Sequence, residues 1–125
     1  IDAAPDNDTL KTMLTQQDED ERTALMLAGT PELTQTIIDA APDNDTLKTM
    51  LTQQDKLMGR TALMLAVQNN KTEKVQTLLD AAPDEDILKT MLTQKDNNGH
   101  IALMQAKTYE QMRILAEAMH KINLI

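Results

Sequence analysis

The sequence predicts an all-α protein that folds as a helical repeat solenoid, and three observations favour this fold class. Residues 1–18 and 38–55 are identical, and residues 79–96 carry a close third version of the same stretch. The copies start about 40 residues apart, a period typical of solenoids. Helix-forming residues dominate the composition, whereas the alternating Val-rich or aromatic runs of strands are missing.

The copies divide the chain into about three repeats, which we expect at residues 1–37, 38–78 and 79–125 of a single domain. A chain of 125 residues has the length of one domain. Its core must be aliphatic, because the chain contains nine Met, one Tyr and no Phe or Trp. The first residues resemble the end of a repeat, so we expect the chain to be a fragment of a longer array.

Each repeat is expected to contain three helices. The clearest first helix covers residues 61–70, where Thr61 caps the start through its hydroxyl and Asn69 and Asn70 tolerate the left-handed conformation that ends a helix. The second covers residues 72–82, and its apolar residues recur at three- and four-residue spacing. They are Val75, Leu78, Leu79 and Ala82. The equivalent helices elsewhere are expected to begin at "TPE" (from Thr30) and "TYE" (from Thr108).

The third helix is the repeated stretch itself. A proline precedes it in every copy: Pro5, Pro42 and Pro83. The aspartates behind each proline suit a helix N-terminus, where free N–H groups and the helix dipole favour a carboxylate. They are Asp6 and Asp8, Asp43 and Asp45, and Asp84 and Asp86. An apolar Leu-x-x-Met-Leu stripe follows, so we expect Met13, Met50 and Met91 in the core.

The identity of the first two copies extends to positions that packing is not expected to constrain. Lys11, Thr12 and Gln16 are expected to be exposed, yet the second copy repeats them without change. We interpret this identity as recent duplication or deliberate engineering.

Two runs, residues 59–82 ("GRTALMLAVQNNKTEKVQTLLDAA") and 96–106 ("DNNGHIALMQA"), resemble ankyrin repeats. That family reads Asp-x-x-Gly-x-Thr-Pro-Leu-His-x-Ala, followed by a second helix that ends Val-x-x-Leu-Leu. The matching residues are Gly59, Thr61, Leu63, Ala66, Val75, Leu78 and Leu79, and then Asp96, Gly99, Leu103 and Ala106. The resemblance covers most of residues 18–121, and the shorter segments "ALMLAGTPE" and "ALMQAKTYE" look like a compact variant of bacterial ankyrin proteins.

The chain departs from the ankyrin pattern in several places. Ala62 and Met64 replace the family's Pro and His, so apolar packing must take over from the usual Thr–His hydrogen bond. Glu21 stands where the first repeat should have Gly, and Ile101 where the third should have Thr. The third helix is an addition that ordinary ankyrin repeats lack. A three-helix unit of about 40 residues also resembles armadillo repeats, which are the alternative architecture.

Charge and composition argue against several functions. Twenty acidic and twelve basic side chains give a formal net charge of −8, which suits neither nucleic acid phosphates nor anionic membrane surfaces. No apolar run has the length of a membrane span, and there is no Cys for disulfide or thiolate chemistry. We therefore expect no nucleic acid or membrane partner and a cytoplasmic location. The resemblance to bacterial ankyrin proteins implies the host cytosol instead, if the chain belongs to a secreted bacterial effector.

We expect no catalytic residue, no cofactor and no metal, and hence no enzyme activity. The "DND" and "DED" triplets lack the Gly and Glu of an EF-hand calcium loop, and helix capping explains them. The acidic run at residues 18–21 is either a solvated turn or a contact for a cation or a basic partner. The only two histidines, His100 and His120, fall on different elements, and the sequence has no glycine-rich phosphate loop.

The resemblance implies a protein–protein interaction module that binds a partner protein through its hairpin tips and concave face. The residues at matching positions are Glu19, Asp20 and Arg22; Leu57, Met58, Arg60 and Gln68; and Asn97, Asn98, His100 and Tyr109. Leu57 and Met58 are candidate apolar anchors, unless the third helix of a neighbouring repeat covers them.

Two alternatives stay open at this point. Exact copies favour a structural spacer or an engineered scaffold without a dedicated partner, whereas the divergent hairpins "QDEDER", "QDKLMGR" and "KDNNGH" favour binding. The second alternative is that this region serves as the targeting arm of an enzyme that lies elsewhere in a longer chain. We expect a monomer or weak self-association through the ends of the stack, with the terminal "INLI" as a cap or a contact for a neighbour.

Overall fold

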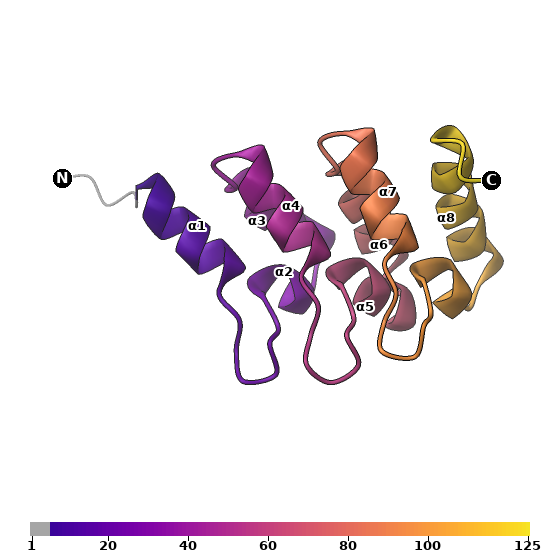
Figure 1. Ribbon diagram of the computed structural model, residues 1–125, viewed down its shortest axis with the longest axis horizontal. Helices are drawn as coiled ribbons and strands as arrows, with labels where there is room; N and C mark the ends of the chain where they lie inside the picture. The colour runs from indigo at the N-terminus through magenta and orange to yellow at the C-terminus, as the bar shows by residue number, and fades with distance from the viewer. Residues whose placement is uncertain (1–5) are drawn as a thin grey trace.

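All regular structure in residues 6–125, which the computed structural model of the protein describes, is helical. The elements are α1 (Asn7–Thr15), α2 (Ala24–Leu27), α3 (Pro31–Asp39), α4 (Asn44–Thr52), α5 (Ala62–Gln68), α6 (Thr72–Asp80), α7 (Glu85–Thr93), the 3-10 helix η1 (Ala102–Gln105) and α8 (Tyr109–Lys121). They follow one another along an extended stack, with α1 at one end and α8 at the other (Figure 1). The prediction of an all-α repeat solenoid is confirmed.

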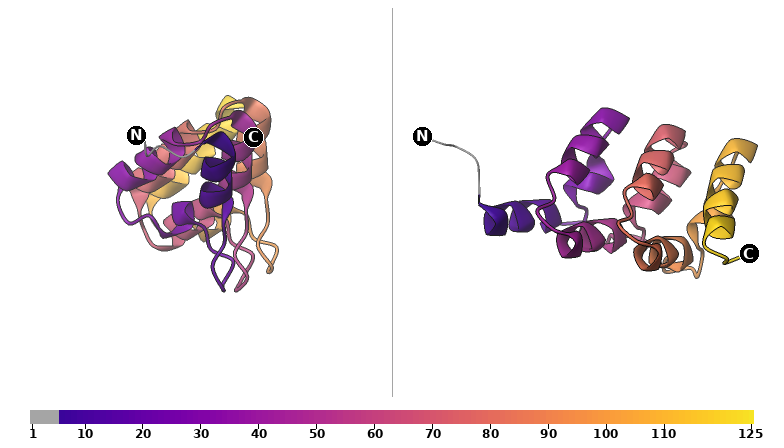
Figure 2. Two further views of the ribbon diagram at one scale, coloured as in Figure 1. Left: turned by 90° about the vertical axis from the view of Figure 1, so that its left-hand side faces the viewer. Right: turned by 90° about the horizontal axis from the view of Figure 1, so that it is seen from above.

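Helices that are equivalent in sequence pack side by side in three rows. One row contains α2, α5 and η1, the second α3, α6 and α8, and the third α1, α4 and α7. Seen from above, α1, α4 and α7 run along one side of the stack and α3, α6 and α8 along the other (Figure 2, right). The third helix of the repeat is therefore a regular part of the architecture, as the sequence predicts.

The helix ends follow the predicted capping residues. The Thr61 hydroxyl accepts the Met64 backbone N–H at 3.3 Å, and the Asp84 carboxylate accepts the Ile87 N–H at 2.9 Å. Asn70 adopts the left-handed conformation with φ of 58° just after α5. Each contact satisfies backbone groups that a helix leaves free at its ends, so the boundaries are set locally.

The core runs through all three rows of helices. One prediction about it, the burial of Met13, is wrong. Met50 and Met91 are 0% and 1% exposed, as expected, whereas Met13 is 57% exposed. The three methionines occupy the same position of the third-row helix. Met13 is uncovered because α1 is the first helix that the structure describes, so no helix packs on that side of it.

Glutamines of the repeated stretch tie neighbouring repeats together. The Gln53 side-chain amide donates to the Thr15 carbonyl oxygen at 3.0 Å, and Gln94 repeats this contact with Thr52 at 2.8 Å. The Gln54 amide likewise donates to the Lys95 carbonyl oxygen at 2.9 Å. Lys11, Thr12 and Gln16 are exposed as expected, and so are Lys48 and Thr49 of the second copy. Gln53 is the exception, because Gln53 and its counterpart Gln94 bond to the preceding repeat.

The Gln53→Ala substitution is expected to lower the free energy of unfolding by about 1 kcal/mol, since it removes one inter-repeat hydrogen bond. Gln16→Ala is the matched control, because Gln16 has the same local sequence but is exposed at the first helix. Its effect should stay within about 0.5 kcal/mol. Urea unfolding of the two variants measures the difference, and equal losses would contradict the tie between repeats.

Lys74 makes a second connection between repeats from inside the stack. It lies in α6, is 5% exposed, and donates to the carbonyl oxygens of Ala28 at 2.8 Å and Met26 at 3.2 Å. These carbonyls lie at the C-terminal end of α2, where a cation is favoured. Burial lowers the pKa of Lys74 from 10.5 to about 8, and the nearby Lys71 adds to the shift. Gln111 is equally buried at the equivalent place in α8.

Lys74→Gln should reveal this pKa shift. Because the folded-state pKa of Lys74 lies below its unfolded value, the folded protein loses this proton first as pH rises. The free energy of unfolding of the parent should therefore rise relative to the variant between pH about 8 and 10.5, by about 1–3 kcal/mol. Urea unfolding of both proteins across this range measures it, and a difference that does not change with pH would contradict the shift.

Candidate functional site

Three hairpins project together from one edge of the stack (Figure 2, left). A backbone hydrogen bond closes each of them, from the Asp18 N–H to Arg22, from Asp55 to Arg60 and from Asp96 to His100. Neighbouring hairpins also bond to each other: the Lys56 N–H donates to the Asp20 carbonyl at 2.8 Å, and the Asn97 N–H to the Met58 carbonyl at 2.7 Å. The hairpins therefore form one continuous, hydrogen-bonded edge.

An aspartate at the start of each hairpin holds the turn from within. Asp18 Oδ1 accepts the backbone N–H groups of Asp20 and Arg22, both at 2.9 Å, and Asp96 Oδ1 accepts those of Asn98 and His100. The bond from the Arg22 N–H lowers the pKa of Asp18, and that from His100 lowers the pKa of Asp96. Both carboxylates thus stabilise the hairpins above the ordinary pKa of 3.8, and this stabilisation is lost as pH falls through the lowered values.

Each hairpin also needs one residue with positive φ. Glu21, Gly59 and Gly99 take this position with φ of 60°, 70° and 79°. A side chain at Gly59 would in addition clash with Asn97 of the next hairpin. Glu21 occupies the glycine position of the first hairpin at a cost of about 1 kcal/mol, because a Cβ atom disfavours the left-handed conformation.

A chain of polar contacts joins the second hairpin to the third. The Arg60 guanidinium bonds to the Asp55 carboxylate at 3.1 Å and to Gln68 Oε1 at 2.9 Å. Gln68 donates to Gln105, and Gln105 in turn donates to Asp96 at 3.1 Å. Arg60 and Gln68, which the sequence marks as partner contacts, thus also hold the hairpins in place. Gln105 is not among the contacts predicted from the sequence, because only the packing of η1 beside α5 brings it close to Gln68.

Asp55→Ala is expected to lower the free energy of unfolding by about 2–4 kcal/mol, because it strands the Arg60 guanidinium and two backbone N–H groups. The Asp55 side chain is fully buried, whereas that of Asp18, at the same place in the first hairpin, is 41% exposed. Asp18→Ala is therefore the control and should cost less. Guanidinium chloride unfolding measures both, and equal losses would contradict the special role of the second hairpin.

The comparison with known families agrees with this geometry. The sequence model for ankyrin repeats (three copies) matches residues 2–90 and 29–125. The chain belongs to the ankyrin-repeat family. Searches among curated proteins and solved structures found no significant match. Ankyrin repeats are generally protein–protein interaction modules, and the family is typically non-enzymatic.

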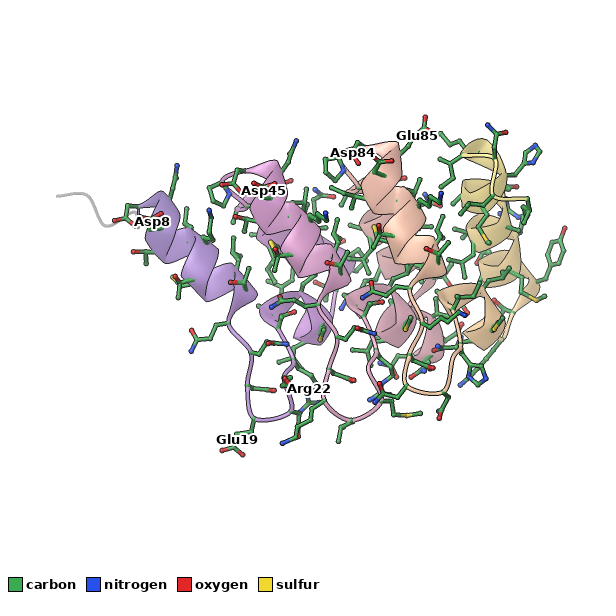
Figure 3. All side chains as sticks on the ribbon, in the orientation of Figure 1. Asp8, Glu19, Arg22, Asp45, Asp84 and Glu85 are labelled. Atoms are coloured by element: carbon green, nitrogen blue, oxygen red, sulfur yellow. The ribbon has the colours of Figure 1, made fainter. Side chains whose placement is uncertain are left out.

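The most exposed apolar side chains of the ankyrin hairpins lie at the middle tip. Leu57 is 59% and Met58 37% exposed, so the alternative in which a neighbouring third helix covers both is wrong. At the first tip, Glu19 points away from the stack, and Arg22 lies just above it (Figure 3). The Arg22 guanidinium pairs with Asp20 at 2.9 Å. Residues exposed at the third tip are Asn97, Asn98 and His100.

Tyr109 does not join the other predicted contacts. It is 79% exposed at the start of α8, where it shares a hollow with Met112 and Ile125 at the end of the stack. Two exposed residues of the hairpin side were not among the predicted contacts. Lys56 adjoins Leu57 at the middle tip, and Leu27, 56% exposed, borders a hollow with Arg22 between α2 and α5. The short segment "ALMLAGTPE" could have predicted the exposure of Leu27, because the first helix of this repeat has only four residues.

Other kinds of site find little support in residues 6–125. In that range no group of three or more His, Asp or Glu side chains is placed to hold a metal ion. None of its helices combines the length and the apolar character that crossing a membrane requires. The acidic residues Asp8, Asp45, Asp84 and Glu85 line the edge opposite the hairpins (Figure 3). There they serve as helix caps and first-turn residues.

Proposed function

We propose that this ankyrin-repeat chain binds a partner protein along its hairpin edge. The observation that carries the proposal is the pair Leu57 and Met58, which stay exposed on the tip of a hairpin whose backbone bonds to both neighbours. Exposed apolar side chains on a rigid polar edge are typical of binding anchors, and Met adapts its shape to varied partners.

The rigidity of the edge supports binding in a second way. The aspartate contacts, the bonds between hairpins and the chain from Asp55 to Asp96 order the backbone before any partner arrives. A partner therefore meets a surface that loses little conformational entropy on binding. In this proposal Arg60 does not contact the partner directly but holds the hairpin that carries Leu57 and Met58, since its side chain is only 18% exposed.

The charge of the edge indicates how the partner is oriented. The first tip carries Glu19 and Glu21 in exposed positions, whereas Lys56 lies at the second tip and His100 at the third. We expect the partner to bring basic side chains to the first tip and apolar side chains to the second. The acidic tip would mainly raise the association rate, so the rate should fall as salt is added.

The alternative of a spacer or engineered scaffold rests on the identical copies. The structure offers another reason for part of that identity, because Gln53 and Gln54 bond to neighbouring repeats. The identical stretch mainly builds the row of α1 and α4, while the residues at the tips differ from one hairpin to the next. The tip residues thus differ between hairpins while the helices that support them stay the same, and this pattern favours binding over a spacer role.

The test is affinity capture from cell lysate with the parent and with a Leu57→Asp, Met58→Asp variant. The control is Met13→Asp, Leu33→Asp, which places the same charges on two side chains of similar exposure (57% and 49%) in α1 and α3. We expect a protein that the parent and the control retain and that the tip variant loses. Losing two anchors should weaken binding by roughly a hundredfold or more.

Two results would contradict the proposal. A protein retained equally by all three baits would place the contact elsewhere on the stack. If no bait retains any protein above background, the hairpin edge has no partner in that lysate, and the result favours the spacer or scaffold interpretation over binding. Circular dichroism of the three baits confirms beforehand that they are equally folded.

A further inference from the structure

A hollow at the junction of the first two repeats carries positive charge without a matching carboxylate. It lies between α2 and α5 and has a volume of about 230 Å³. Of the ten residues that line it, Arg22, Lys71 and Lys74 are basic and none is acidic. Acidic side chains nevertheless outnumber basic ones by twenty to twelve in the whole chain. The hollow is therefore a basic spot on an acidic protein.

The unequal lengths of the two neighbouring helices explain the hollow. α2 has four residues and α5 has seven, so the last turn of α5 extends beyond the end of α2. Ala66 and Asn69 from the end of α5 line one side of the hollow, and Ala28 and Gly29, which lead from α2 to α3, line the other. Its walls thus come from two adjacent repeats, and its shape is a feature of their junction.

Lys74 brings an ammonium group to this hollow. Its Nζ atom donates to the carbonyl oxygens of Met26 and Ala28, which also line the hollow. A lysine ammonium group has three N–H donors. Within residues 6–125 these two carbonyls are its only hydrogen-bond acceptors, so one donor is left over. An acceptor bound in the hollow would satisfy it.

Lys71 adds a second cation to the same hollow. Burial is the main cause of the lowered pKa of Lys74, and the charge of Lys71 lowers it further, so the two ammonium groups repel each other. None of the ion pairs in the described part of the chain includes either lysine. Glu32 and Glu73 line the adjoining hollow between the starts of α3 and α6 without pairing with them. An anion held by both lysines would relieve their repulsion.

Arg22 connects the hollow to the hairpin edge. Its carbonyl oxygen closes the first hairpin, and its side chain lines the hollow. The guanidinium group lies 3.6 Å from the Asp18 carboxylate and 2.9 Å from that of Asp20, which balance its charge. The unbalanced charge of the hollow therefore comes from Lys71 and Lys74.

The next junction of the stack, between α5 and η1, lacks this arrangement. Gln111 takes the place of Lys74 there and donates to Asn70 Oδ1 at 3.0 Å. Lys107 Nζ donates to the Gln68 carbonyl oxygen at 3.3 Å. A neutral amide replaces the buried cation, so the pair of lysines is particular to the first junction.

We propose that this hollow binds an acidic side chain of the partner protein. The inference rests on the proposed function, because the carboxylate belongs to the protein that binds along the hairpin edge. Lys71 and Lys74 donate hydrogen bonds to the carboxylate, while Leu57 and Met58 contact apolar side chains of the same partner. Hydrogen bonds between charged groups are about twice as strong as those between neutral ones. The partner should thus carry an acidic group beside its apolar contact.

NMR with ¹³C-labelled lysines tests the hollow, with a capped hexa-glutamate peptide as the probe, at pH about 6.5 and about 0.15 M salt. The Lys71 and Lys74 signals should move saturably, with a Kd of roughly 1–10 mM. Lys71→Gln and Lys74→Gln should each weaken binding by at least about threefold. Lys56→Gln and Lys107→Gln remove the same charge elsewhere and should change the Kd by less than about 1.5-fold.

The peptide should also raise the pKa of Lys74. This pKa is about 8 in the free protein, and a bound carboxylate stabilises the charged form of the lysine. The pH midpoint of the Lys74 signal should therefore rise by at least about half a pH unit at saturating peptide. The peptide accordingly binds best below pH about 8 and loses affinity as the pH rises through the raised value.

Three results would overturn the proposal. The two lysine signals stay in place when the peptide is added, or Lys56→Gln weakens binding as much as Lys71→Gln does. The third is that sodium phosphate binds the hollow more tightly than the peptide, which would assign it to a phosphate group instead of a carboxylate. Circular dichroism checks that every variant is folded.

A neutral tip variant, Leu57→Ser, Met58→Ser, separates this inference from the proposed function. It removes the apolar anchors without adding charge, so it should bind the peptide like the parent. Peptide binding together with failed capture from lysate would support the carboxylate site and contradict the contact at the hairpin tip. Successful capture without peptide binding would contradict the hollow alone.

Discussion

The contact between one repeat and the next is the constraint on which the rest of this structure depends. The first eight helical segments of residues 6–125 have between four and nine residues each, too short to be stable alone. Within this range the repeats share one core instead of each enclosing its own. Apolar side chains such as Met50 and Val75 become buried only because a neighbouring repeat lies against them. Stability therefore accumulates along the stack as repeats pack on one another.

The same contacts that join the helices also order the hairpins. Gln54 bonds to the Gly59 carbonyl of its own hairpin and to Lys95 of the next repeat, so helix stacking and hairpin position are coupled. Arg60 couples the hairpin to α5 in a similar way through Gln68. The tips are thus free to vary in sequence while their backbone stays in place, which is what a recognition surface requires.

Residues that share the hairpin edge consequently differ in what they do. The polar groups of Arg60 and Gln68 bond to each other and support the edge, whereas the side chains of Leu57 and Met58 stay exposed to solvent.

Local interactions could be predicted from the sequence, since both partners lie within a few residues of each other. The Thr61 and Asp84 caps, the left-handed Asn70 and the three-helix repeat all follow from such short-range rules. Exposure could not be predicted in this way. Met13 and Met50 stand in identical sequences, yet Met13 is 57% exposed and Met50 0%, because a neighbouring helix covers the Met50 side of α4 and none of the described helices covers the Met13 side of α1. The amide chain from Gln68 to Gln105 joins residues 37 positions apart, so it too arose only when stacking brought α5 and η1 together. The sequence alone thus determined the repeating unit. The tertiary structure decided which copy of each residue is buried, hydrogen-bonded or exposed for binding, because burial depends on neighbours that the local sequence does not contain.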